Sequence, residues 1–324
     1  MRMNPKDRDF ERIARYFMEI RGFRGQFTLE KVPGGKATTR ILRMGRENTF
    51  MVKVFMESFP SDKNVFHAQN EVAIGETLKD LSLSTKKYLF VKTDSDNPVG
   101  VPFAVSTYIV GENLKKVNKR KIVLIVPKVL DYLFFLHSIT PSKLFGYIGF
   151  LKERKPMEST FSFGQFESAY LRADIQREGI IFSPQEKKNL NQAVEILNQE
   201  KLFCLCHWDI TRENTLWDGC KVHLIDWSYA HYADPASDIA GVTFWLMESG
   251  SKSQIRQELS YIYKRYLGLG FDIVPTLLFY LIQRHIELGR IKGKIYLEKG
   301  KKLLRCLPVN SLEKLIDAIF TAMI

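Results

Sequence analysis

The sequence predicts an α+β protein in which a small antiparallel sheet is followed by a larger, mostly helical part. Three observations predict this class. Short strand-like segments separated by turn residues are concentrated in the first third of the chain. Segments with helical periodicity fill most of the remainder. The length of 324 residues is also long for a single core, which favours two domains.

The first third begins with a helical pattern and continues with strands. Phe10, Ile13, Ala14 and Phe17 recur at helical spacing, so we expect a helix over 4–21. Five strand-like segments follow, with a second helix expected over 65–81 between the third and the fourth. The expected strands are 27–32, 38–44, 49–56, 88–93 and 103–110. The short connections PGGK and GREN between the first three strands favour an antiparallel meander, and the last two strands complete a small sheet.

The rest of the chain has mainly helical patterns, with one interruption. We expect helices over 121–138 (with Pro127 near its start), 163–178, 184–200, 236–248, 253–267, 273–290 and 310–322. In the interruption, the strand-like runs TLW and KVHLIDW flank DGC, and Asp-Gly between strands is a strong hairpin signal. We therefore expect a first domain over 1–110 and a second over 111–324.

Composition limits the class of protein and its partners. The net charge of +12, with basic runs at 115–121, 152–155 and 292–305, favours anionic partners, although each run alone is typical of a solvated lysine-rich surface. The N-terminus lacks the apolar core of a signal peptide, and no apolar run is long enough to span a bilayer. We therefore expect a cytoplasmic protein. The sequence does not indicate an oligomeric state.

The four cysteines are too few for a disulfide framework in a chain of this length. Cys204 and Cys206 alternate as residues on one face of a strand do. Tetrahedral zinc needs four ligands, and Cys220 and Cys306 lie in unrelated contexts. We interpret the cysteines as buried free thiols.

Three oxygen-bearing side chains lie close together in the segment that contains the hairpin. Asp209 follows a strand-like run, Asn214 begins the hairpin and Asp226 ends its second strand. Carboxylate and carboxamide oxygens suit Mg²⁺, so Asn214 and Asp226 are candidate metal ligands. Asp209 would then be left to take a proton from an attacking hydroxyl, as phosphoryl transfer requires. The alternative is that all three are ordinary turn residues.

The blocks HWDITRENTL and HLIDWSYAHYADPASDIA resemble the signature of the aminoglycoside phosphotransferase and choline kinase family. The resemblance implies a bilobal protein-kinase-like fold, with a small antiparallel-sheet N-lobe and a larger helical C-lobe. It also implies roles for six residues. Asp209 would be the catalytic base, Asn214 and Asp226 the magnesium ligands, His207 and Asp238 braces of the catalytic loop, and Asp234 the acid of the DP turn.

Two of these residues also have alternative interpretations. His207 could itself be a general base, and Asp238 could cap the helix that follows it. The chain departs from the family at three positions. Many members have Gly at the position of Trp208, His at Thr211 and Glu at Ser228.

The family also implies an ATP-binding N-lobe. Lys53, inside the apolar strand FMVKVF, would reach the phosphates, and Glu71 on the next helix would hold it, with Glu76 as the fallback. A strand lysine could instead be a solvent contact on an edge strand. Gly34 and Gly35 would let backbone N–H groups approach the triphosphate, although Gly-Gly is also an ordinary hairpin turn.

The segment FAVSTYIVGENL resembles the family's connection between the lobes, where backbone groups bind adenine. The alignment assigns this role to the carbonyl of Thr107 and the N–H of Ile109.

We therefore expect an ATP- and Mg²⁺-dependent kinase that acts on a hydroxyl of a small molecule, such as an amino alcohol, a sugar, an aminoglycoside-like compound or another metabolite. The basic C-terminal segment favours a neutral or anionic acceptor. For choline, an aromatic cage could use Trp227, Tyr229, Tyr232 and Trp245, but core packing explains these residues as well.

Two other functions are open. The first is a protein kinase, although the chain lacks the D-F-G and A-P-E blocks. The second is a non-catalytic kinase-like module that binds nucleic acid or a protein through its basic surface. The intact set of Lys53, Asp209, Asn214 and Asp226 argues against this module, so we do not expect a nucleic-acid partner.

Overall fold

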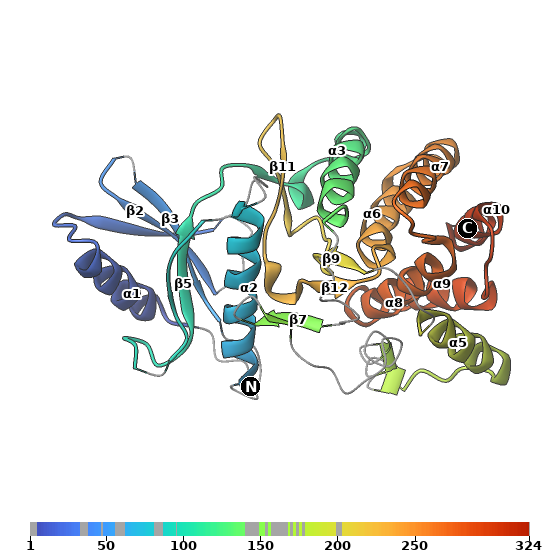
Figure 1. Cartoon of the computed structure of the whole chain (residues 1–324), viewed down its shortest axis with the longest axis horizontal. Coiled ribbons are helices and arrows are strands. Elements are labelled where there is room, and N and C mark those ends of the chain that lie inside the picture. The colour runs from blue at the N-terminus through green and yellow to red at the C-terminus, as the bar shows by residue number, and fades with distance from the viewer. Residues whose placement is uncertain are drawn as a thin grey trace. The chain divides into compact units, whose positions relative to one another are not determined.

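A computed structural model describes residues 5–323 with internal gaps. The gaps are 33–37, 47, 56–61, 81–86, 95, 140–148, 153–154, 157–167, 169–170, 173–174, 177–178 and 199–202. The chain forms two compact units (Figure 1). The first comprises residues 1–111, 150–156 and 216–230, and the second comprises 112–149, 157–215 and 231–324.

The first unit is built on a five-stranded sheet whose neighbouring strands are antiparallel, as the strand patterns predict. The spatial order is β1 (Phe27–Lys31), β2 (Thr39–Met44), β3 (Asn48–Val54), β5 (Phe103–Thr107) and β4 (Tyr88–Lys92). The lysine-bearing strand β3 is therefore an interior strand. A solvent contact on an edge strand, the alternative role for its lysine, is excluded.

Helices cover both faces of this sheet. The amphipathic helix α1 (Asp7–Ile20) packs its buried residues against Val52, Val54 and Phe103. The helix α2 (Asp62–Asp80) contributes Ala68 to a second cluster with Phe55 and Ala104. Successive strand side chains point to opposite faces, so Val52 and Val54 face α1 and the residue between them faces α2. That residue is Lys53.

The Asp-Gly turn joins β10 (Thr215–Trp217) to β11 (Val222–Leu224), as predicted. Asp218 Oδ1 accepts hydrogen bonds from the backbone N–H groups of Cys220 and Lys221, at 2.8 and 2.6 Å. Gly219 has φ +101°, a left-handed conformation that a side chain would strain. The 3₁₀ turn η2 (Trp227–Tyr229) follows the hairpin, and β7 (Gly149–Lys152) pairs antiparallel with β8 (Lys155–Pro156).

The second unit is mostly helical, as expected. Its helices are α3 (Lys119–His137), α5 (Pro184–Leu197), α6 (Ala236–Ser249), α7 (Lys252–Gly268), α8 (Val274–Lys292), α9 (Lys294–Arg305) and α10 (Leu312–Met323). The strand β9 (Cys204–Cys206) pairs antiparallel with β12 (His231–Ala233). β6 (Glu112–Asn113) and the 3₁₀ turn η1 (Leu114–Lys116) precede α3. Helix α8 packs against both α6 and α9, and its Leu277, Leu278 and Leu281 are fully buried.

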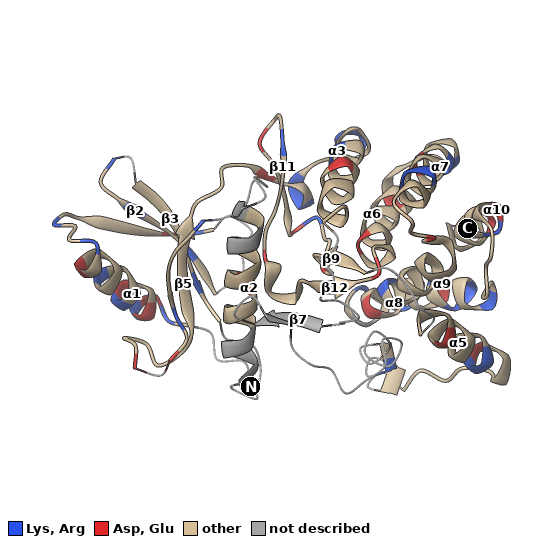
Figure 2. Ribbon diagram, in the orientation of Figure 1, with Lys and Arg blue, Asp and Glu red and all other residues tan. Residues whose placement is uncertain are grey.

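The structure differs from the sequence-based expectations at two helices. The sequence indicates only a basic run over 292–305, but this run contains α9. Figure 2 marks the basic residues of this helix in blue, and its Leu303 and Leu304 are fully buried. Helix α3 begins at Lys119, earlier than expected, because the Asn118 side chain caps it by accepting a hydrogen bond from Lys121 N–H. Pro127 therefore lies in the interior of the helix rather than near its start. The helix expected over 163–178 lies largely outside the described residues.

None of the helices in the described part of the chain is both long enough and apolar enough to cross a membrane.

Candidate active site

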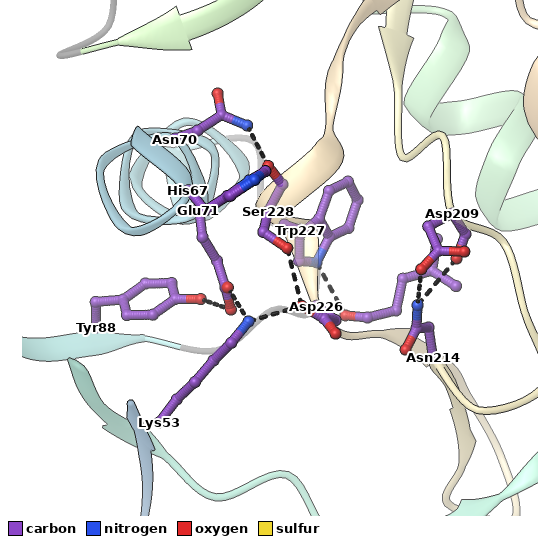
Figure 3. Close-up of polar contacts among 11 residues, drawn as sticks. Lys53, His67, Asn70, Glu71, Tyr88, Asp209, Asn214, Asp226, Trp227 and Ser228 are labelled. Carbon is purple, nitrogen blue, oxygen red and sulfur yellow. Dashed lines mark hydrogen bonds and ion pairs between the residues drawn. The ribbon is translucent and has the colours of Figure 1, made fainter. Parts of the chain in front are cut away.

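In the first unit, Lys53 forms ion pairs with two carboxylates (Figure 3). Its ammonium group contacts Glu71 from α2 and lies 2.6 Å from Asp226 Oδ1, just beyond the hairpin. The Glu71 side chain is fully buried, and its other oxygen accepts a hydrogen bond from the Tyr88 hydroxyl on β4. Glu71 therefore holds the strand lysine, and the side chain of the fallback Glu76 lies outside the described residues. Tyr88 is a partner that the sequence analysis missed.

The charges in this group stabilise one another. Burial alone would lower the pKa of Lys53, but the carboxylates of Asp226 and Glu71 outweigh it and hold that pKa above its usual range. Burial and the Glu71 charge raise the pKa of the Tyr88 phenol. At neutral pH the lysine is therefore a fixed cation, and the tyrosine is a neutral hydrogen-bond donor.

Asp226 has an unusual backbone conformation for a residue with a side chain. Its φ of 68° and ψ of 60° are left-handed, and the 3₁₀ turn η2 follows it at once. The Ser228 hydroxyl donates to Asp226 Oδ1 at 3.0 Å, the oxygen that also contacts Lys53. Asp226 therefore lies just after β11 rather than at its end, and this conformation turns its carboxylate toward the lysine strand.

Helix α2 also holds the segment that follows Asp226. The Asn70 amide donates to the carbonyls of Ser228 and Ala230, at 3.1 and 2.9 Å, and His67 Nδ1 lies 3.1 Å from the Ser228 carbonyl. One helix therefore positions both Glu71 and the backbone beyond Asp226.

In the second unit, Asp209 and Asn214 form a direct pair (Figure 3). Asn214 Nδ2 donates to Asp209 Oδ2 at 2.7 Å and to the Asp209 carbonyl at 3.1 Å. This orientation of the carboxamide turns its oxygen, the atom suited to a hard cation, away from Asp209. The loop between the two is closed by Thr211, which accepts from Asn214 N–H and from the Thr215 hydroxyl. Asp209 keeps 28% of its side chain exposed.

Asp238 ties the start of this loop to helix α6. Its two oxygens accept the backbone N–H groups of His207 and Trp208, at 2.8 and 2.7 Å. His207 Nδ1 in turn accepts from Asp209 N–H at 3.4 Å, and its side chain is fully buried. Trp208 has φ 63°, at a position where many members of the resembled family have Gly. Asp238 therefore bonds to the loop rather than capping α6. The His207 ring holds the backbone N–H of Asp209.

A second buried histidine backs Asp238. His137 Nε2 from α3 lies 3.1 Å from Asp238 Oδ2, and its Nδ1 lies 2.5 Å from the Tyr266 hydroxyl. Burial alone would lower the pKa of His137, but hydrogen bonding to Asp238 outweighs it and raises that pKa to about 9. Although burial opposes it, the same bond lowers the pKa of Asp238. The pair is therefore ionic at neutral pH.

Asp234 caps the same helix. Its Oδ1 accepts from Ala236 N–H, at the first residue of α6, over 2.9 Å, and its carbonyl accepts from Ser237 N–H. The DP turn thereby fixes the start of the helix that carries Asp238.

Arg284 on α8 is a further neighbour of Asp209 that the sequence did not reveal. Its Nη2 donates to the Ile210 carbonyl at 2.9 Å, and its Nη1 lies 3.7 Å from Asp209 Oδ1. The only sequence signal is a charged residue shortly after the apolar run LLFYLI.

Four further residues are predicted from the family resemblance to bind ATP. Gly34 and Gly35 lie outside the described residues. Thr107 is the last residue of β5, and its N–H donates to the Lys87 carbonyl at 2.9 Å. Ile109 lies two residues further on, in the segment before β6. Their roles in nucleotide binding stay predictions.

All four cysteines are free thiols, two of them buried, and the aromatic residues of the possible choline cage are mostly packed in the core, which largely agrees with two of the sequence-based interpretations. Cys204 and Cys206 are buried free thiols, but Cys220 is exposed and Cys306 partly so. The ligand atoms of His137, Cys204 and Cys206 lie within 4.8 Å of one another. Both ring nitrogens of His137 already have other partners, so packing explains the group. Of the possible cage residues, Trp227, Tyr232 and Trp245 are buried.

Comparison with known proteins identifies the family. Residues 28–266 match the model of the phosphotransferase enzyme family, which covers more than half of the chain. The chain belongs to this family, and its activity class is that of a small-molecule kinase with an alcohol group as acceptor. Compared by sequence with curated proteins, it matches none.

Solved structures share the fold at low sequence identity. A thermostable mutant of aminoglycoside phosphotransferase APH(4)-Ia, in ternary complex with ADP and hygromycin B, has a TM-score of 0.59 and 13% identity over 94% of this chain and 98% of its own. A putative fructosamine-3-kinase from Haemophilus somnus 129PT has a TM-score of 0.59 and 17% identity over 91% and 96%.

A third structure, the gentamicin complex of APH(2")-IIa, has a TM-score of 0.53 and 17% identity over 97% of this chain and 99% of its own. The predicted protein-kinase-like fold is confirmed.

Proposed function

We propose that this protein transfers the γ-phosphoryl group of ATP to a hydroxyl group of a small molecule, with Mg²⁺ as the required ion. The ion-paired set of Lys53, Glu71 and Asp226 is the observation that carries the proposal. A partly buried lysine held by one helix carboxylate, with a second carboxylate beside it, is the arrangement that binds nucleotide phosphates in kinase-like enzymes. We infer that residues 1–110 form the nucleotide-binding domain and 111–324 the catalytic and acceptor-binding domain.

The candidate nucleotide-binding residues have distinct roles in this proposal. Lys53 orients the α- and β-phosphates, and the buried Glu71 keeps its ammonium group in place. The Tyr88 hydroxyl occupies the other oxygen of Glu71, which fixes the direction of that carboxylate. Gly34 and Gly35 cover the triphosphate, and the backbone groups of Thr107 and Ile109 bind the adenine.

The donor set suits magnesium. A carboxylate from Asp226 and a carboxamide oxygen from Asn214 are hard ligands, and Mg²⁺ takes one or two such groups together with phosphate and water oxygens. The hydrogen bonds of the Asn214 amide nitrogen to Asp209 leave the carboxamide oxygen as its ligand atom. When bound, the ion neutralises charge on the phosphates.

Asp209 accepts the proton of the acceptor hydroxyl. The hydroxyl oxygen forms a new bond to the γ-phosphorus, the bond between that phosphorus and the β,γ-bridging oxygen breaks, and ADP leaves. Asn214, which donates to Asp209 Oδ2, keeps the carboxylate in one orientation. His207, Asp238 and Asp234 hold the loop and the start of α6, so the base is positioned from beneath.

A coupled ADP-release screen tests the function. Amino alcohols, sugars, nucleosides, amino acids and aminoglycosides would each be supplied with Mg²⁺ and ATP, and a protein mixture would serve as the alternative acceptor. We expect at least one small molecule to raise ADP release well above the hydrolysis that occurs without acceptor. ADP release stimulated only by the protein mixture would contradict the proposal.

A further inference from the structure

The carbonyl group of Ile210, the residue after the proposed base, is held between two helices. Arg284 Nη2 on α8 donates to this oxygen at 2.9 Å. On α6, a Cβ atom added at Gly241 would lie 2.6 Å from the same oxygen, so the helix backbone approaches it closely. A side chain at position 241 would displace the loop, and the guanidinium of Arg284 supplies the hydrogen bond that the carbonyl requires.

The same guanidinium also faces the carboxylate of the proposed base. Arg284 Nη1 lies 3.7 Å from Asp209 Oδ1, whereas Asn214 occupies Oδ2. The two oxygens of Asp209 therefore have different neighbours, an amide donor on one side and a cation on the other. The planar fork of arginine can contact the carbonyl and the carboxylate at once, which the single ammonium group of lysine cannot do in the same geometry.

An ordinary surface role does not account for these contacts. Arg284 also pairs with Glu287 one turn further along α8, at 3.3 Å, and such an i,i+3 pair on a helix contributes little by itself. The Arg284 side chain, however, is only 18% exposed, and it contacts the catalytic loop 74 residues away in the chain. An exposed ion pair would need neither this burial nor the bond to a loop carbonyl.

We propose that Arg284 is a positioning residue for catalysis, which holds the carbonyl of Ile210 and orients the carboxylate of Asp209 toward the acceptor hydroxyl. This inference rests on the proposed function, because it assigns Arg284 to the reaction that Asp209 carries out. Arg284 acts through Asp209 and takes no part in binding the nucleotide. Its loss should therefore lower kcat and leave the KM for ATP unchanged.

The test compares Arg284→Gln and Arg284→Lys with the wild-type protein in the ADP-release assay, with Mg·ATP alone and with the best acceptor from the screen. We expect Arg284→Gln to lower kcat about 10- to 100-fold, because small displacements of a reacting group have effects of this size. Arg284→Lys should recover part of the rate. Arg256→Gln on α7, which breaks an exposed pair with Glu313, is the matched control and should keep the wild-type rate.

Chemical rescue separates positioning from a general structural role. Arg284→Ala removes the whole guanidinium, and millimolar guanidinium chloride should restore part of its kcat, whereas sodium chloride at the same ionic strength should not. A nucleotide-dependent thermal shift measured on each variant reports whether ATP still binds. A fold defect would lower the melting temperature and the ATP response together, and guanidinium would not reverse it.

Two results would overturn the inference. One is a wild-type kcat in Arg284→Gln, and the other is a loss of rate that neither lysine nor guanidinium restores. A wild-type protein that binds ATP but transfers phosphate to no acceptor, water included, would instead refute the proposed function. The assay of the unmodified protein therefore distinguishes the two failures.

Discussion

Lys53 Nζ lies 2.6 Å from Asp226 Oδ1, although the two residues are 173 positions apart in the chain. The pairing follows from three local features. The alternation of β3 turns Lys53 away from α1, helix α2 brings Glu71 to the same side, and the left-handed backbone at Asp226 directs its carboxylate inward. Together these local features place the Lys53 ammonium group between the carboxylates of Glu71 and Asp226.

Replacing Lys53 with methionine should therefore impair both stability and nucleotide binding. The change keeps the length of the side chain but leaves two carboxylates in a largely buried site without their cation, since Glu71 is fully buried and Asp226 is 14% exposed. Breaking a buried ion pair costs about 3 kcal/mol or more. Chemical denaturation should show this loss of stability, and the ATP-dependent thermal shift should disappear.

The matched control is Lys92→Met on β4, an edge strand of the same sheet. Lys92 pairs with Asp94 over 3.4 Å at the surface, where such pairs contribute between about 0 and 1 kcal/mol. This variant should retain the wild-type stability and response to ATP. If Lys53→Met and Lys92→Met behaved alike, the buried ion-paired set would not have the role proposed for it.

Asp209→Asn should abolish turnover while ATP binding persists. The substitution is nearly isosteric and removes only the ability to accept a proton, and general-base catalysis contributes about 10²- to 10⁴-fold to a rate. The ADP-release assay measures the first effect, and the nucleotide-dependent thermal shift measures the second. Near-normal turnover in this variant would refute the assignment of Asp209 as the base.

Local patterns in the sequence were sufficient to predict the sheet, most of the helices and the hairpin. Period-2 alternation and turn residues are local properties, and so is the Asp-Gly turn that Asp218 and Gly219 form. Lys53 and Glu71 could be paired only because the resembled family links a strand lysine to a helix glutamate. The structure adds the reason, which is that both lie on the α2 side of the sheet.

The partners that the sequence did not reveal come from distant elements. Tyr88 reaches Glu71 from β4, His137 reaches Asp238 from α3, and Arg284 reaches Asp209 from α8. A tyrosine in a strand or an arginine in an apolar helix has many possible uses, and only the tertiary arrangement selects one. Helix α9 was missed for a different reason, because its many lysines obscured the apolar stripe of Leu303 and Leu304.

Gly241→Ala should disturb the catalytic loop without touching any charged group. The added methyl group would lie 2.6 Å from the Ile210 carbonyl oxygen and 2.9 Å from its Cβ, distances that require the loop to move. Overpacking of this kind costs about 1–3 kcal/mol. We expect a lower melting temperature together with a lower kcat, since Ile210 is bonded to Arg284 and follows Asp209.

Gly268→Ala is the control, because it makes the same chemical change at the end of α7, where an added Cβ would meet no atom within 4 Å. Alanine favours helix over glycine by about 1 kcal/mol, so this variant should be at least as stable as the wild-type protein. Equal activity of the two alanine variants would show that the contact between α6 and the loop has no part in catalysis.

The buried pair of His137 and Asp238 should make stability depend on pH in a defined window. His137 has a pKa of about 9 in the folded protein and 6.5 without its partners, so folding favours the protonated imidazole. Its contribution is fully present below pH 6.5 and is lost as pH rises toward 9. The shift corresponds to about 3 kcal/mol. Besides Asp238, the titratable groups near His137 include Tyr266, Cys204 and Cys206, whose pKa values burial raises above their usual range.

Denaturation of the wild-type protein and of His137→Asn at a series of pH values measures this contribution. The difference in unfolding free energy between the two should decrease between pH 6.5 and 9. His285→Asn provides a control with the opposite sign, because burial lowers the pKa of His285 to about 4 and its titration affects stability only below pH 6.5. A wild-type curve parallel to that of His137→Asn from pH 6.5 to 9 would mean that His137 is neutral in the folded protein, and Asp238 would then hold the catalytic loop without a cationic partner.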